Sequence, residues 1–130
     1  FCFSQTINQE ITYGKEKKML LGTINKEGLS KAPYNEWFNK NLDNYNVNEK
    51  IAEKLKVSLN DYTIKAFLGT WCGDSRKEVP RFYNIMRYLN ITDYTIIGMD
   101  LNKKTPQKLE KGSKISCKSF GSLLNFLVFI

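Results

Sequence analysis

The sequence predicts an α/β fold, and three consecutive segments between residues 62 and 100 carry that prediction. Residues 62–68 are rich in β-branched and aromatic residues and end at Gly69, which is typical of a strand. From Ser75 to about Asn90, apolar residues recur at three- and four-residue intervals, which predicts an amphipathic helix. Residues 94–99 are strand-like again. A strand, a helix and a strand in this order predict a crossover between parallel neighbours.

The helix predicted over residues 75–90 has one apolar and one charged face. The positions expected to face the core are Val79, Phe82, Tyr83, Met86 and Leu89. A shorter helix is predicted to start after the capping residue Asn48 and to run to about Val57. Its expected apolar face consists of Ile51, Ala52 and Leu55.

Residues 6–47 are mixed and rich in turn signals, so we interpret them as an N-terminal extension packed on the domain formed by residues 48–130. A compact aromatic group in this extension consists of Tyr34, Trp37 and Phe38. Residues 103–114 contain Thr105-Pro106 and Gly112 and predict a loop with at most a short helix. The apolar run 123–130 has two interpretations, a buried strand or a truncated or altered C-terminus that leaves the domain incomplete.

Residues 1–5, Phe-Cys-Phe-Ser-Gln, resemble the tail of a secretory signal peptide. The alternative is that the chain is a fragment and its first residues form a strand. If the signal interpretation holds, cleavage near Gln5 removes Cys2, unless Cys2 is lipid-modified, and the protein works outside the cytoplasm, in the periplasm or cell envelope.

The composition supports one packed domain, because 130 residues with 42% apolar content give enough material for a single core. No stretch reaches the roughly 20 apolar residues of a transmembrane segment. The net charge is +7, and residues 103–118 contribute six Lys against one Glu without interleaved aromatic residues. This pattern favours a solvated basic loop over a nucleic-acid site. The absence of His excludes the common catalytic triads and most zinc sites, so we expect no metal and no cofactor.

The strongest chemical signal lies at the junction of the strand and the long helix, in Gly69-Thr-Trp-Cys-Gly-Asp-Ser-Arg76. A cysteine directly before a helix faces backbone N–H groups without helical acceptors and the positive end of the helix dipole. Both stabilise the thiolate, so the pKa of Cys72 should fall below its ordinary value of about 8.5. Arg76 and Lys77 add to this effect and Asp74 opposes it. A lone cysteine is more often an inert core residue, but this position favours a nucleophile that needs no histidine.

With Trp71-Cys72 followed by Gly73, Asp74 and Ser75, the motif resembles the thioredoxin family, in particular exported bacterial members with Trp-Cys-Gly-Asp-Ser. Pro80 also stands where thioredoxins have a helix-kinking proline. The resemblance implies a thioredoxin-like domain with a central mixed sheet flanked by helices. It also implies a catalytic Cys72, with Trp71, Gly73, Asp74, Ser75 and Pro80 supporting it.

Three positions depart from the family pattern. Ser75 replaces the second cysteine, which resolves the mixed disulfide, and a hydroxyl does not perform that step. Ala66 stands where the family has a buried acid. Residues 115–119 contain no proline at the place of the substrate-binding cis-proline. Cys117 lies in that window, and it is either a resolving thiol or, the more favoured interpretation, a residue of a disturbed tail.

Two functions therefore compete. The first is a monothiol thiol-disulfide oxidoreductase that uses Cys72. Its partners are a disulfide-containing protein or a mixed disulfide of a small thiol, with an external thiol as reductant. The second is a redox-inactive thioredoxin-fold module that binds a protein partner through the loop around Trp71 and the N-terminal extension.

Overall fold

The structure, a computed structural model, describes residues 6–59, 63–102 and 104. These residues form an α/β arrangement with one mixed sheet of four strands, in the order β1-β2-β4-β3, flanked by helices. The predicted α/β class is thus confirmed. In chain order the elements are β1 (Gln9–Tyr13), β2 (Lys17–Ile24), α1 (Lys26–Leu29), α2 (Asn35–Asp43), α3 (Glu49–Leu59), β3 (Ile64–Leu68), α4 (Gly73–Tyr88) and β4 (Tyr94–Gly98).

The predicted strand, helix and strand are present as β3, α4 and β4. The two strands pair in parallel, with Ala66 opposite Ile96, as expected for strands joined by a crossover helix. The helix begins at Gly73, two residues earlier than predicted, and ends at Tyr88. All five positions of its predicted apolar face are buried, including Leu89 directly after the helix. The three- and four-residue spacing of apolar side chains was therefore a reliable signal.

Residues 6–47, interpreted from the sequence as an N-terminal extension with no elements assigned to it, contain two strands and two helices. Strand β2 pairs with β1 over residues 17–21 and with β4 over residues 22–24, both antiparallel. Gly22 stands at the change of partner with φ +73°, a conformation that glycine adopts without strain. The N-terminal segment thus supplies an interior strand of the sheet.

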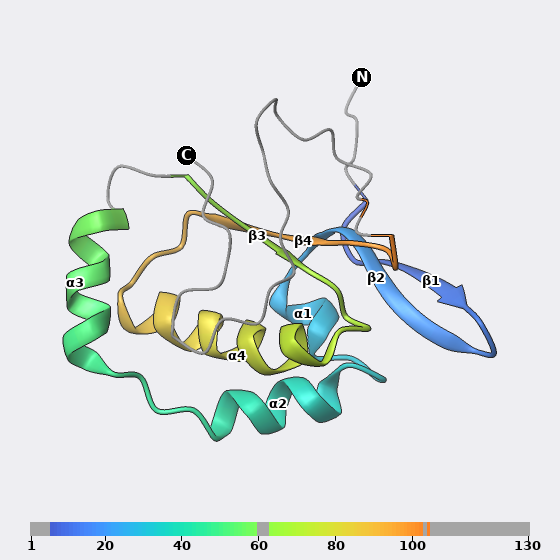
Figure 1. The fold of residues 1–130 in the computed structure, drawn as a ribbon, viewed down its shortest axis with the longest axis horizontal. Helices are drawn as coiled ribbons and strands as arrows, with labels where there is room; N and C mark the ends of the chain where they lie inside the picture. Colours follow the sequence, from blue (N-terminus) through green and yellow to red (C-terminus); the bar gives the residue numbers. More distant parts are fainter. Residues whose placement is uncertain (1–5, 60–62, 103, 105–130) are drawn as a thin grey trace.

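The helices are distributed unevenly around the sheet. Figure 1 shows α1, α2 and α4 on the same face, with α2 on the far side of α4 from the strands. Helix α3 stands at the end where β3 begins, and the β1–β2 hairpin extends from the opposite end. Contacts between aromatic rings link the layers. The ring centres of Phe38 in α2 and Tyr83 in α4 are 5.5 Å apart, and those of Phe82 in α4 and Tyr94 in β4 are 5.2 Å apart. The core therefore forms between the sheet, α4 and α2.

The second predicted helix is present as α3. Asn48 precedes it, and its Oδ1 accepts a hydrogen bond from the N–H of Ile51 at 3.3 Å, as a capping residue does. Ala52 is buried and Leu55 is half-buried, whereas Ile51, which was assigned to the apolar face, is 40% exposed. No helix in the described ranges is long and apolar enough to cross a membrane.

Candidate active site at the start of α4

Cys72 is the residue that immediately precedes α4. Its backbone is extended, with φ −91° and ψ 126°, and its carbonyl accepts the N–H of Arg76 at 3.0 Å as the first bond of the helix. The N–H of Cys72 donates to the carbonyl of Gly69 at 2.9 Å, which closes a tight turn after β3. The half-buried side chain of Cys72 thus lies at the positive end of the helix dipole, as predicted.

Thr70 joins this turn to two other elements. Its side chain is buried, and its Oγ1 accepts a hydrogen bond from the N–H of Leu20 in β2 at 3.2 Å. Its carbonyl accepts a hydrogen bond from Nε of Arg76 at 2.8 Å. The guanidinium of Arg76 is therefore held beside the turn, at the carbonyl of Thr70, which stands two residues before Cys72.

Trp71 has a clear packing role. Its Nε1 donates to the carbonyl of Met99, directly after β4, at 2.9 Å. The indole also lies against Gly69, where an added Cβ would come within 2.6 Å of ring atom Cε2. Glycine at position 69 thus lets the indole close over the turn. The ring is half-buried, so it both packs and contributes to the surface beside Cys72.

Ser75, at the position of the second family cysteine, supports the turn in another way. Its Oγ accepts a hydrogen bond from the N–H of Gly69 at 3.2 Å. Gly73 and Asp74 lie exposed in the first helical turn. Asp74 and Ser75 are both residue types that commonly cap helices, but Cys72 occupies the capping position of α4 and both lie within the helix. The serine hydroxyl instead links the end of β3 to the start of α4.

Pro80 lies within α4 and is buried. A proline has no N–H, so the carbonyl four residues earlier, that of Arg76, loses its helical donor. Nδ2 of Asn41 in α2 donates to this carbonyl at 3.1 Å and takes the place of the missing bond. Helix α2 is therefore tied to the first turn of α4, the turn that follows Cys72.

Several expectations concern residues that the structure does not describe. They are residues 1–5 with Cys2, Cys117 with the segment 115–119, and the apolar run 123–130. Of the basic stretch 103–118, only Lys104 is described. Ala66, at the position of the family's buried acid, is fully buried in β3. In the described ranges, no group of three or more Cys, Asp or Glu side chains is arranged to hold a metal ion.

Comparisons with known proteins add no relative. No protein-family model matches the chain, and neither a curated protein nor a solved structure does. The described residues thus define an α/β protein with a cysteine at the start of its longest described helix.

The sequence did not reveal three residues that shape this site: Leu20, Asn41 and Thr70. Pro80 carried a partial signal, because a proline inside a helix requires an outside donor for one carbonyl. Which residue supplies that donor depends on how α2 packs on α4. The contact between Leu20 and Thr70 likewise depends on the position of β2, a strand that the sequence did not predict.

Proposed function

We propose that this protein is a thioredoxin-like thiol-disulfide oxidoreductase with a single nucleophilic cysteine, Cys72. The observation that carries the proposal is the position of Cys72 at the N-terminus of a 16-residue helix, after the tight turn that follows β3 of the central sheet. The helix dipole and the N–H groups of the first turn stabilise a thiolate there. The resemblance of Trp71-Cys72 and Pro80 to the thioredoxin pattern supports the same function.

Charged side chains near the turn act in the same direction overall. Arg76 is fixed against the carbonyl of Thr70 and brings a positive charge close to Cys72. Asp74 and Arg76 are both exposed, so solvent screens both charges, but the hydrogen bond to the carbonyl of Thr70 keeps the guanidinium at the turn. We therefore expect the pKa of Cys72 to lie below the ordinary value for a cysteine thiol, about 8.5.

In the proposed reaction the Cys72 thiolate attacks one sulfur of a substrate disulfide. A bond forms between Cys72 and that sulfur, the substrate S–S bond breaks, and the other sulfur leaves as a thiolate. An external thiolate then attacks the substrate sulfur of the mixed disulfide and releases the Cys72 thiolate. A second external thiol reduces the disulfide formed in that step. The substrate thus gains two electrons, and two external thiols become one disulfide.

The site favours an external reductant over internal resolution. Ser75 has no thiol, and its hydroxyl accepts the N–H of Gly69. The proposed partners are therefore a disulfide-containing protein or a mixed disulfide of a small thiol, with an external thiol as reductant. Export to the periplasm or cell envelope is part of the proposal and rests on residues 1–5 alone. N-terminal sequencing of the mature protein tests it, since export predicts a start near residue 6.

The first test measures the rate of iodoacetamide alkylation of Cys72 against pH, with each cysteine quantified separately by peptide mass spectrometry. We expect a midpoint below 8 for Cys72 in the folded protein. The same cysteine in denaturant is the matched reference, with a midpoint of about 8.5. A midpoint of 8.5 or higher in the folded protein contradicts an activated nucleophile.

The second test measures reduction of a glutathionylated peptide in excess glutathione. Activity that C72A abolishes supports the enzyme. An S75C variant supplies an internal thiol, so it should accelerate reduction of protein disulfides. If the wild type shows no turnover but still binds a protein partner, the redox-inactive binding module is favoured instead.

A further inference from the structure

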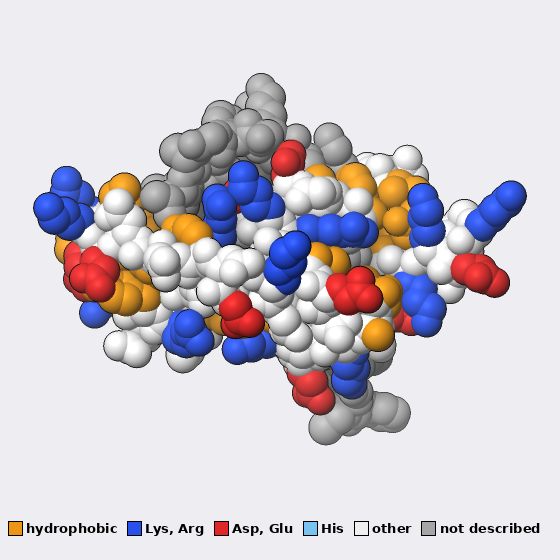
Figure 2. Space-filling model, turned by 90° about the horizontal axis from the view of Figure 1, so that it is seen from below, with side chains coloured by type: hydrophobic (Ala, Val, Ile, Leu, Met, Phe, Trp, Pro, Cys, Tyr) orange, Lys and Arg blue, Asp and Glu red, His pale blue; other side chains and the backbone are white. Residues whose placement is uncertain are grey.

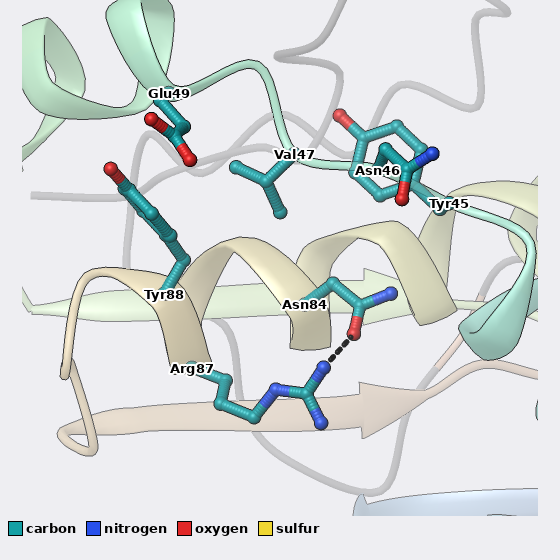
Figure 3. Close-up of a pocket in the computed structure, with 7 residues that line it drawn as sticks. All are labelled: Tyr45, Asn46, Val47, Glu49, Asn84, Arg87 and Tyr88. Atoms are coloured by element: carbon teal, nitrogen blue, oxygen red, sulfur yellow. Dashed lines mark hydrogen bonds between the residues drawn. The ribbon is translucent and has the colours of Figure 1, made fainter.

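A pocket beside the last turns of α4 and the outer edge of β1 both lie apart from the turn at Cys72. The pocket, drawn in Figure 3, is lined mainly by polar side chains, and Nη2 of Arg87 there already donates to Oδ1 of Asn84 at 2.9 Å. Strand β1 is the outermost strand on its side of the sheet, and no strand of the described ranges pairs with its outer edge. The β1–β2 hairpin also projects beyond the helices (Figure 1), so this edge is accessible to another extended chain.

The direction of the backbone groups of β1 follows from its neighbour β2. The N–H of Leu20 in β2 donates to Oγ1 of Thr70, and its carbonyl oxygen lies against Gly98 of β4, where an added Cβ would clash with it. Both groups of Leu20 thus point away from β1. Its partner across the pair, Glu10, therefore directs its own N–H and C=O to the outer edge, and so does Thr12 two residues further on. Within the described ranges, nothing bonds to these outward groups.

The side chains of β1 leave this edge open. Lysines and prolines commonly protect edge strands, and the sequence of β1, Gln-Glu-Ile-Thr-Tyr, contains neither. The charged residues Lys15 and Glu16 stand in the turn that ends the hairpin, and Figure 2 shows side chains of both charges at this end of the molecule. The carboxylate of Glu10 is drawn inward, because it pairs with Nζ of Lys18 at 2.9 Å and accepts the hydroxyl of Tyr34 at 3.1 Å.

Charge and strand length select one register for the pairing of β1 with an antiparallel copy of itself. Since residues 10 and 12 carry the outward groups, an even position must face an even position. A two-fold axis at Glu10 would place two carboxylates opposite each other, which is destabilising. An axis at Thr12 would place Glu10 opposite Gly14, which lies beyond the strand with φ +57°. An axis at Ile11 places Glu10 opposite Thr12 of the second copy and keeps every residue of both strands paired.

We propose that β1 pairs antiparallel with β1 of a second copy of this chain, with the two-fold axis at Ile11. The two four-stranded sheets then join into one continuous sheet. The half-buried side chains of Ile11 and Tyr13 lie on the same face of the strand, so they contact their counterparts across the new pair. The paired strands are short, so the dimer is weak and forms at raised protein concentration. The pairing uses no residue of the turn at Cys72 and is independent of its chemistry.

The first test measures the mass of the wild type by sedimentation equilibrium in reductant over a range of concentrations, where we expect a reversible rise from one chain toward two. The second test is disulfide cross-linking of I11C under mild oxidation. Opposite residues on the axis have Cα atoms about 4.5 Å apart, within the range that a disulfide spans. Q9C is the matched control, because its two copies would lie roughly 13 Å apart along the paired strands. Peptide mass spectrometry separates these links from those of the native cysteines.

The third test uses charge at position 12, where the hairpin and the dimer predict opposite effects. Within one chain this position faces Lys18, and in the dimer it faces Glu10 of the second copy. T12E should therefore weaken the dimer about fivefold and T12K should tighten it about fivefold, since two symmetric pairs change together. Urea unfolding of the monomer should show the reverse order, with T12E more stable than T12K. A purely structural effect would move both measurements in the same direction.

A wild type that stays monomeric at every concentration overturns the proposal, and the edge then receives a different partner or none. Equal cross-linking of Q9C and I11C overturns the pairing around Ile11. A dimer that T12E and T12K weaken alike also overturns it, because the position then does not face Glu10 of the second copy.

Discussion

The hydrogen bond from Asn41 to the carbonyl of Arg76 allows a quantitative test of how α2 supports the start of α4. The bond is 3.1 Å long, and it exists because Pro80 leaves that carbonyl without a helical donor. A neutral hydrogen bond contributes about 1 kcal/mol to stability. Since Asn41 is half-buried and Arg76 is exposed, water replaces part of this bond, and we expect its loss in N41A to cost about 0.5–1 kcal/mol, apart from the change in helix propensity.

The contribution of this bond should depend on the proline. In P80A the restored N–H of residue 80 can donate to the carbonyl of Arg76, so Asn41 is no longer needed there. We therefore expect N41A to have almost no effect in the P80A background beyond the change in helix propensity. The change in helix propensity accompanies N41A with either residue at position 80. Any loss of packing around Pro80 accompanies P80A with either residue at position 41. Both effects therefore cancel in a double-mutant cycle. The expected coupling free energy is about 0.5–1 kcal/mol.

The assay is urea unfolding of the wild type, the two single variants and the double variant, followed by far-UV circular dichroism. N39A is the matched control, because Asn39 is an exposed asparagine of the same helix. It should show no coupling to P80A. If N41A costs the same free energy with proline and with alanine at position 80, the bond does not compensate for the proline, and the reasoning is refuted.

Three further predictions follow from single contacts. T70V leaves the N–H of Leu20 without its acceptor and should destabilise the fold by about 1–3 kcal/mol, whereas T70S should retain most of the stability; equal urea midpoints for both variants would contradict this. S75A removes the acceptor for the N–H of Gly69 and should cost about 1 kcal/mol in the same assay, and an unchanged midpoint would count against it. Burial, and then the nearby Glu10 carboxylate, raise the pKa of Tyr34 above 10.0. Its contribution to stability is therefore complete below pH 10 and lost at higher pH, so Y34F should lose less stability between about pH 9 and pH 11 than the wild type.

The sequence predicted the middle of this fold well because the signals there are local. The spacing of Val79, Phe82 and Met86 defines a helix face without reference to the rest of the chain. The segments 62–68 and 94–99 are apolar enough to be identified as strands. The start of the long helix was misplaced by two residues. Ser75 and Asp74 are both common capping residues, whereas Cys72, which occupies that position here, is not.

The N-terminal half was not predicted because its elements depend on partners distant in the sequence. Strand β2 combines exposed Lys17 and Lys18 with buried Met19 and Leu20, so it lacks the simple alternation of a half-buried strand. Its two halves pair with different strands, which blurs the pattern further. The position of Cys72 before a helix was predicted from the motif. The bonds that fix its turn could not be predicted, because they come from β2, α2 and the end of β4.

The same contacts bear on how the reactive cysteine is positioned. Two bonds from the N-terminal segment reach the turn and the first helical turn around Cys72, one from Leu20 to Thr70 and one from Asn41 to Arg76. Residues 6–47 therefore do more than cover the domain, because they hold both sides of the proposed active site. A chain without them would lose β2 from the interior of the sheet together with both of these bonds. A cysteine on such a chain would lose the fixed geometry that the proposed chemistry requires, so the N-terminal segment belongs to the functional unit.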